Sequence, residues 1–264
     1  MNATSVWTST SLDLPSLPLA RDATEDDGTG DRVTAHLLLI GAGGLGCSVL
    51  KALAPHGPLK ITLVDDDTVD RTNLHRQVLF TAADIGAKKG AVARQYLVRA
   101  GFEPAHIRWI DDRFIPENAE TLLTGVNVLV EGSDNFATKF LAADAAHLSG
   151  VPVVHGAALG WKTTAMLARG GKAGCYRCVF EDVPDEPAAS CESAGVLGPV
   201  VALGGAVMAQ FALEALSKQP TWGQLWHHNA LTGRGRTLNV SQREDCHLCG
   251  LAPRIKGLCR ASYA

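Results

Sequence analysis

The segment Leu37–Cys47, "LLLIGAGGLGC", constrains the fold more than any other part of the chain. A run of aliphatic residues leads directly into a G-x-G-x-x-G pattern at Gly41, Gly43 and Gly46. This order is typical of a buried strand that turns tightly into a helix, where backbone N–H groups approach a phosphate. The pattern predicts a nucleotide site. On its own it fits a dinucleotide cofactor as well as ATP.

Strand and helix patterns alternate along the rest of the chain, which predicts a Rossmann-like, doubly wound α/β fold. The sheet is expected to be mostly parallel, with helices on both faces and mixed strands near the C-terminus. Residues 1–30 are rich in Ser, Thr, Asp, Pro and Gly and are expected to form a flexible arm, whereas residues 31–264 form a single domain. The expected strands are 35–41, 60–67, 106–114, 126–134, 151–157, 163–169 and a hairpin over 224–240, and the expected helices are 44–54, 88–100, 137–150 and a long apolar one near 194–213.

The amino-acid composition limits the classes of function that the chain can have. The chain of 264 residues is 46% hydrophobic and carries a net charge of -3, which suits a large core and argues against a nucleic-acid surface. Residues 194–213 have no charge, but their glycines and a proline favour a buried helix, at a subunit interface for instance, over a membrane span. The N-terminal sequence lacks a secretory signal pattern, so a cytoplasmic protein is expected.

An acidic and basic cluster follows the second expected strand, in "DDDTVDRTNLHRQ". Asp65 lies nineteen residues after Gly46, where an acid that binds ribose hydroxyls is expected. Asp67, Asn73 and Arg76 come next, and this combination suits a metal-bound triphosphate better than a nicotinamide. A solvated loop with a capping Asn is the alternative interpretation of the same residues.

Two C-x-x-C pairs, "CYRC" and "CHLC", predict a metal site. Cys175, Cys178, Cys246 and Cys249 together supply the four thiolates of a closed tetrahedral zinc site. Such a site is structural, because it leaves no open position for catalysis. A redox dithiol or two unrelated pairs are the alternatives.

The motifs "GAGGLG", "DDDTVDRTNLHRQ", "GAKKG" and "SDN" together resemble the MoeB/ThiF family, relatives of the ubiquitin-activating enzymes. The resemblance covers residues 33–251 and implies that the nucleotide is ATP. It implies phosphate contacts from Arg76 and Lys89, with Lys88 the weaker candidate, and a magnesium ligand at Asp134. The residues placed around ATP by the motifs are Gly41, Gly43, Gly44, Gly46, Asp65, Asp67, Thr72, Asn73, Leu74, His75, Arg76, Gln77, Lys89, Asp134 and Asn135.

The family adenylates the C-terminal glycine of a small ubiquitin-like sulfur carrier protein and releases pyrophosphate. The acyl-adenylate is then converted to a thiocarboxylate by a sulfur donor. The resemblance therefore implies an adenylyltransferase that uses ATP with magnesium, binds a carrier ending in Gly-Gly and a sulfur donor protein, and forms a homodimer. Cys191 precedes the apolar helix, where relatives can form a thioester or acyl-disulfide, so the implied catalytic set is Asp134, Arg76, Lys89 and Cys191. A loop cysteine without a role in adenylation is the alternative.

The chain departs from the family pattern at two places. It lacks the N-terminal "RYxRQ" segment whose second arginine reaches the partner's ATP; upstream of the turn, Arg21 and Arg32 are its only arginines. Lys139 replaces the arginine of "SDNxxTR". These departures leave open a catalytically impaired partner subunit, or a relative that acts on a small-molecule or tRNA carboxylate. The intact Asp134, Arg76 and Lys89 favour an active enzyme, and a nicotinamide oxidoreductase has only the glycine turn in its favour.

Overall fold

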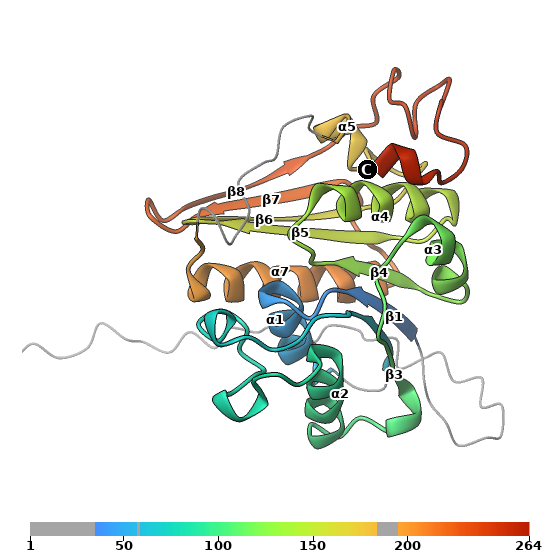
Figure 1. Cartoon of the computed structure of the whole chain (residues 1–264). Coiled ribbons are helices and arrows are strands. Elements are labelled where there is room, and N and C mark those ends of the chain that lie inside the picture. Colours follow the sequence, from blue (N-terminus) through green and yellow to red (C-terminus); the bar gives the residue numbers. More distant parts are fainter. Residues whose placement is uncertain (1–34, 57–58, 184–194, 264) are drawn as a thin grey trace, which may run out of the picture.

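The computed structural model describes residues 35–56, 59–183 and 195–263. Its strands form one sheet in the order β3-β2-β1-β4-β5-β6-β7-β8 (Figure 1). The strands from β3 to β5 pair in parallel, and those from β5 to β8 pair antiparallel. The strands are β1 Ala35–Ile40, β2 Leu59–Val64, β3 Ile107–Ile110, β4 Val128–Glu131, β5 Val153–Leu159, β6 Lys162–Ala168, β7 Gln224–Asn229 and β8 Arg234–Asn239.

Helices cover both faces of the sheet (Figure 1). One core cluster joins the sheet to α1, α2 and α7, and the other joins it to α3 and α4. The α-helices are α1 Gly44–Leu53, α2 Lys89–Arg99, α3 Pro116–Leu123, α4 Phe136–Leu148, α5 Arg177–Phe180 and α7 Gly198–Ala215, and a short 3₁₀ turn, η4 Arg260–Tyr263, lies near the C-terminus. The expected doubly wound, mostly parallel α/β fold is confirmed.

The central strand β1 shows why both faces need cover. Leu37 and Leu39 belong to one core cluster, and Leu38 and Ile40 belong to the other. Successive side chains of a strand point to opposite faces, so a strand that is apolar throughout must be buried on both sides. The continuous apolar run in the sequence therefore predicted the layered architecture correctly.

Two elements differ from the expectation. Helix α3 was not predicted, and strand β3 is shorter than expected, because it ends at Ile110 rather than at Phe114. Pro116 occupies the first turn of α3, where its fixed backbone angle and missing N–H are tolerated. The Asn118 side chain accepts from the N–H of Ile115 at 3.0 Å, so this helix is capped by a local signal that apolar periodicity does not reveal.

Helix α7 is the expected long apolar helix, and it packs inside the chain. It is the single helix among the described residues that is long and apolar enough to span a membrane, and half of its apolar window is buried. A Cβ on Gly204 would lie 2.1 Å from Thr163 Oγ1, and one on Gly205 would lie 2.4 Å from the Ser48 Cβ. These two glycines therefore allow close packing against β6 and α1, and a dimer surface on α7 would have to use its opposite face.

Candidate functional site

A cavity of about 1030 Å³ opens at the carboxyl ends of β1, β2 and β4 and extends along β5 to β7. Loops that follow parallel strands meet at one edge of the sheet, which is where open α/β folds bind ligands. Most of the expected nucleotide residues lie here. Those lining the cavity are Gly41, Gly43, Gly44, Asp65, Asp67, Thr72, Asn73, Arg76, Gln77, Lys89, Asp134 and Asn135.

Three expected site residues lie outside the lining. Gly46 faces inward, where a Cβ would lie 2.0 Å from the Gly41 carbonyl oxygen. Leu74 packs against the core, and His75 Nδ1 lies 2.9 Å from the carbonyl oxygen of Thr72. Gly46 is thus required by the tight turn itself, and Leu74 and His75 shape the loop that carries their neighbours.

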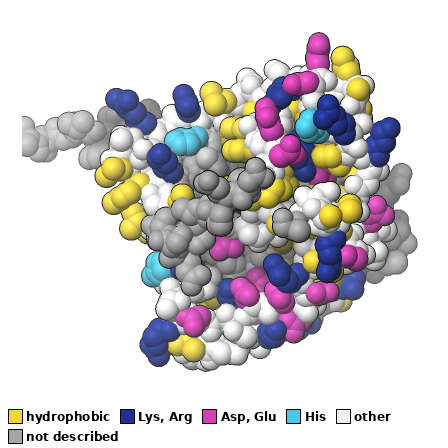
Figure 2. Space-filling model, turned by 45° about the horizontal axis from the view of Figure 1, so that its top comes forward, with side chains coloured by type: hydrophobic (Ala, Val, Ile, Leu, Met, Phe, Trp, Pro, Cys, Tyr) yellow, Lys and Arg dark blue, Asp and Glu magenta, His cyan; other side chains and the backbone are white. Residues whose placement is uncertain are grey.

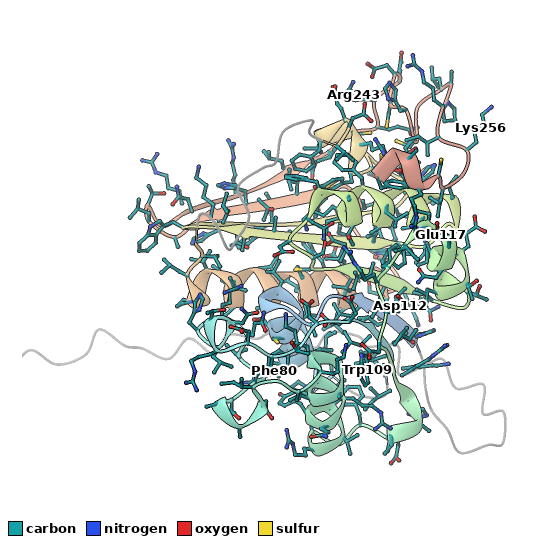
Figure 3. The ribbon with its side chains drawn as sticks, in the orientation of Figure 1. Phe80, Trp109, Asp112, Glu117, Arg243 and Lys256 are labelled. Carbon is teal, nitrogen blue, oxygen red and sulfur yellow. The ribbon has the colours of Figure 1, made fainter. Side chains whose placement is uncertain are left out.

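The Asp65 carboxylate is fixed at the end of β2. The backbone N–H of Ala42, within the glycine turn, donates to Asp65 Oδ2 at 2.6 Å, and the N–H of Asp67 donates to Oδ1 at 3.0 Å. Burial raises the pKa of Asp65 above its usual value, and the Ala42 N–H opposes this rise. Trp109, beside α2 in Figure 3, donates from its ring nitrogen to the Asp65 carbonyl at 3.0 Å.

The two adjacent lysines at the start of α2 have different surroundings. Lys89 Nζ lies 2.9 Å from Asp67 Oδ2, its side chain is 7% exposed, and it lines the cavity. Lys88 instead pairs with Asp111 at 2.9 Å and donates to the carbonyl of Asp66. Of the two lysines, Lys89 is the one that lines the cavity, and its contact with a phosphate stays a prediction.

The loop after β2 presents polar groups to the cavity from Thr72 to Gln77. Asn73 Oδ1 accepts from Gln77 Nε2 at 2.9 Å, which ties the two ends of this segment together. The Arg76 guanidinium lines the cavity and donates to the carbonyl of Thr72 at 3.4 Å. The Gln77 side chain is buried, and its Oε1 has no hydrogen-bond partner among the described residues.

The turn after β4 carries Asp134 and Asn135. The Asp134 side chain is exposed at the cavity. Asn135 begins α4, and its side chain accepts from the Thr138 N–H at 2.8 Å as an N-cap. Asn135 therefore has a structural role whether or not it also contacts a ligand.

Sequence reasoning missed a buried ionic cluster beneath this turn. Glu131, at the end of β4, is fully buried and accepts from the backbone N–H and hydroxyl of Ser133 at 2.7 and 2.6 Å. Lys139 Nζ lies 2.9 Å from Glu131 Oε2 and also donates to the carbonyl of Gly156. His155 Nδ1 lies 3.2 Å from the same Glu131 oxygen.

This cluster explains the lysine at position 139. Its ammonium donates to Glu131 and Gly156, so its charge balances a buried carboxylate. Burial by itself raises the pKa of Glu131, but Lys139 and His155 overcome that effect and lower it to about 2. The sequence contained one signal for this cluster, a glutamate at the end of an apolar run. The partners of Glu131 could not be predicted without knowing which strands are neighbours.

The four expected metal ligands come together at the end of the domain opposite α2. The sulfur atoms of Cys175, Cys178, Cys246 and Cys249 lie within 4.8 Å of one another, and all four residues are buried. Thiolates at about 2.3 Å from a tetrahedral zinc ion are separated by about 3.8 Å. The Sγ–Sγ distance is 3.6 Å between Cys175 and Cys246 and 3.4 Å between Cys178 and Cys249, so the cluster fits zinc.

The other cysteines and histidines also have a place. Cys47 is fully buried in α1, and Cys259 is exposed. His228 stacks on Trp226 with ring centroids 5.7 Å apart, so it shares a face of β7 with Trp226 while His227 faces the other side. Cys191 and the upstream arginines, Arg21 and Arg32, lie outside the described residues.

Comparison with known proteins gives the family. The ThiF family model matches residues 19–249. The chain belongs to the ThiF family. Two relatives match this ThiF-family protein over almost their whole length: a "Sulfur carrier protein adenylyltransferase" of Thermus thermophilus is 34% identical (96% of both chains), and a "SAMP-activating enzyme E1" of Haloferax volcanii is 31% identical (91% of this chain and 90% of the relative).

Solved structures show the same fold. The ThiF-family protein superimposes on Escherichia coli MccB, crystallised with ATP, with a TM-score of 0.68 and 22% identity. The match covers 82% of this chain and 66% of MccB. At that identity the likeness concerns the fold alone. The sheet with its covering helices is thus a known architecture.

Proposed function

We propose that this protein uses ATP to adenylate the C-terminal glycine of a small ubiquitin-like sulfur carrier protein, with release of pyrophosphate. The observation that carries the proposal is the cavity, which brings the glycine turn, Asp65, Arg76, Lys89 and Asp134 together at one edge of the sheet. Full-length relatives named as enzymes that activate such carriers support the choice of substrate.

The reaction joins two anions, so the site must reduce their repulsion. The carrier's terminal carboxylate attacks the α-phosphorus, the bond to the β-phosphate oxygen breaks, and pyrophosphate leaves. Asp65 would hold the ribose, while Arg76 and Lys89 would neutralise the phosphates and keep the attacking groups in line. Lys89 has a counter-ion, Asp67, which a bound phosphate could replace.

Metal ions complete the proposed site. Asp134 offers an exposed oxygen ligand at the cavity, the ligand type that magnesium prefers. Magnesium would there neutralise charge on the phosphates. We also assign zinc to the four-cysteine cluster, where it would have a structural role.

Further partners follow from the family. We propose that a sulfur donor protein acts on the adenylated carrier. We also propose that the Cys191 thiolate can attack the carbonyl carbon of the acyl-adenylate, so that a thioester to the carrier forms and AMP leaves. The proposed homodimer would use the exposed face of α7, which presents Pro199, Leu203 and Ala206. Figure 2 shows acidic and basic side chains interspersed on one face of the molecule, a pattern that suits protein partners better than nucleic acid.

ATP–pyrophosphate exchange with and without a carrier ending in Gly-Gly tests the proposal. We expect carrier-dependent exchange that Asp134→Ala abolishes. Lys89→Met should lower the rate by about 10²-fold or more, because a charge that stabilises the transition state is lost. Lys88→Met is the matched control and should retain the rate. ATP binding without exchange for any carrier would contradict the proposal and favour an impaired partner subunit.

A further inference from the structure

The cavity has a second part that the nucleotide residues do not account for. Beyond β4 it runs along β5 to β7, where its walls are mostly small or apolar. The lining residues of this part include Gly156, Ala157, Ala158, Met166, Tyr176 and Leu225. A polar ligand group here would find few partners, so each polar side chain in this wall matters for recognition.

His155 is a buried polar side chain in this wall. It is 3% exposed and lines the cavity. Its Nδ1 lies 3.2 Å from the Glu131 carboxylate, which can only accept, so Nδ1 carries the proton. Nε2 is then an acceptor, and it has no hydrogen-bond partner among the described residues. A buried acceptor without a donor is unfavourable, and a bound ligand can remove that penalty.

The imidazole ring is held in place from several sides. Glu131 is itself fixed by Lys139 and by Ser133. The Tyr176 ring packs on the His155 ring with centroids 4.4 Å apart. The ring therefore cannot turn to find another partner without breaking the contact with Glu131, so the orientation of its Nε2 is fixed.

The position of His155 selects which ligand can supply the donor. Asp65 ends β2 and His155 lies on β5, three strands away in the order β2-β1-β4-β5, which is about 14 Å at the usual strand spacing. An extended peptide covers roughly 3.3 Å per residue, so its last two residues can bridge from a reacting phosphate near β1 and β4 to β5. Glycines in such a peptide offer only their backbone N–H as donors.

We propose that His155 Nε2 accepts a hydrogen bond from a backbone N–H of the carrier's C-terminal Gly-Gly segment. This inference rests on the proposed function and adds a substrate-positioning residue to it. The contact places the terminal carboxylate. Burial and the Lys139 charge lower the pKa of His155, so the ring is neutral with Nε2 as an acceptor, and the contact with Glu131 fixes the orientation of the ring. The small side chains beside it, Ala157 and Ala158, leave room for a glycine backbone.

The test combines a protein variant with altered carriers. Two semisynthetic carriers have an N-methyl group on the last or on the penultimate glycine, which removes one N–H donor. Full-length wild-type enzyme and His155→Phe are compared by ATP–pyrophosphate exchange. We expect one N-methyl carrier to lose about tenfold in kcat/KM with wild-type enzyme. The His155→Phe variant should lose about tenfold with the normal carrier, chiefly through a higher KM for the carrier, and nothing further with that N-methyl carrier.

The outcomes separate the two proposals. If the loss in kcat/KM caused by His155→Phe multiplies with the loss caused by the N-methyl group for both carriers, the role of His155 is overturned and the proposed adenylation still holds. Equal rates for all three carriers with wild-type enzyme would also overturn the role of His155. This comparison needs no variant, so it remains informative if His155→Phe does not fold. No exchange with wild-type enzyme would instead overturn the proposed function. An unchanged KM for ATP in His155→Phe is expected and distinguishes lost positioning from a disturbed fold.

Discussion

Gly43 and Gly46 belong to the same turn but face different surroundings. A Cβ on Gly46 would lie 2.0 Å from the carbonyl oxygen of Gly41, and backbone atoms cannot yield cheaply. A Cβ on Gly43 would meet no heavy atom within 4 Å, and the φ of -73° suits any residue. Gly46 is therefore needed for folding, whereas Gly43 leaves space that a phosphate can use.

Alanine at these two positions should therefore have opposite effects. Gly46→Ala is expected to destabilise the protein by about 3 kcal/mol, because the turn must open. Gly43→Ala should unfold like the wild type in urea but bind ATP more weakly in calorimetry, since its methyl group occupies the phosphate space. A stable Gly46→Ala variant with normal ATP affinity would contradict the structure of the turn.

The buried pair Glu131–Lys139 gives a pH-dependent prediction. The pKa of Glu131 is about 2 in the folded protein, below its ordinary 4.5, so the ionised carboxylate stabilises the fold above pH 4.5. That contribution is lost as the pH falls from 4.5 towards 2. Lys139→Met leaves the carboxylate unpaired and should cost about 3–5 kcal/mol at pH 7.

Urea unfolding of wild type and Lys139→Met across pH 7 to 3.5 measures this effect. The difference between the two proteins should shrink as the pH falls from 4.5 towards 3.5, because the wild type then loses the stabilisation that its ionised Glu131 contributes. A difference that is independent of pH would contradict the assignment. Lys88→Met is the control, since its ion pair with Asp111 is exposed to solvent and should contribute little to stability.

At the level of elements, α7 is held by close backbone approach. A Cβ on Gly205 would meet the Ser48 Cβ and the carbonyl of Leu45, so at this point α7 contacts α1 through its backbone. The uncharged composition of this segment predicted burial. It did not distinguish packing within the chain from packing against a second copy, because both need the same small residues.

Gly205→Ala should separate these helices and destabilise the protein by about 1–3 kcal/mol, as overpacking does elsewhere. The measurement is urea unfolding by circular dichroism. Gln210→Ala, on the exposed side of the same helix, should remain within about 0.5 kcal/mol of the wild type. Equal stability of the two variants would argue against the α1–α7 contact.

The elements that sequence patterns predicted share a physical basis. Residues 37–40 of β1 and 128–130 of β4 are buried on both faces of the sheet, so they are apolar, and the side chains that follow these two strands meet at one edge. Helix α3 was not predicted because its sequence signals are a proline and a capping residue rather than apolar residues at helical spacing. The contact of His155 with Glu131 escaped because it depends on β4 and β5 being neighbours, which neither segment states by itself.

At the scale of the whole molecule, the C-terminal segment is attached to the domain at several points, two of which are buried. Cys246 and Cys249 join Cys175 and Cys178, and further along the Tyr263 hydroxyl donates to Asp144 Oδ2 at 2.7 Å. Asp144 is also bound by the buried Arg177 guanidinium at 2.7 Å. The spacing of the cysteine pairs predicted the first attachment. No pattern predicted the second, because a lone terminal tyrosine carries no spacing signal.

Loss of the metal should therefore loosen the C-terminal segment more than the cavity, whose lining includes none of the four cysteines. We expect about one zinc per chain by mass spectrometry, lost in Cys246→Ser. Limited proteolysis should then cut within the segment from 241 onwards, while ATP binding persists. Cys259→Ser is the control and should keep its metal. Full protease resistance of Cys246→Ser would contradict the prediction that zinc holds the C-terminal segment against the domain.

The cysteine pairs have a consequence for synthesis on the ribosome. Cys175 and Cys246 are 71 residues apart in sequence, so the first pair emerges well before the second. At roughly 5–20 residues per second, this interval lasts on the order of 4–14 s. During this interval the thiols of Cys175 and Cys178 are present in the nascent chain without the second cysteine pair. The yield of native protein should thus depend on how well the cell keeps nascent thiols reduced and supplies zinc at the end of translation.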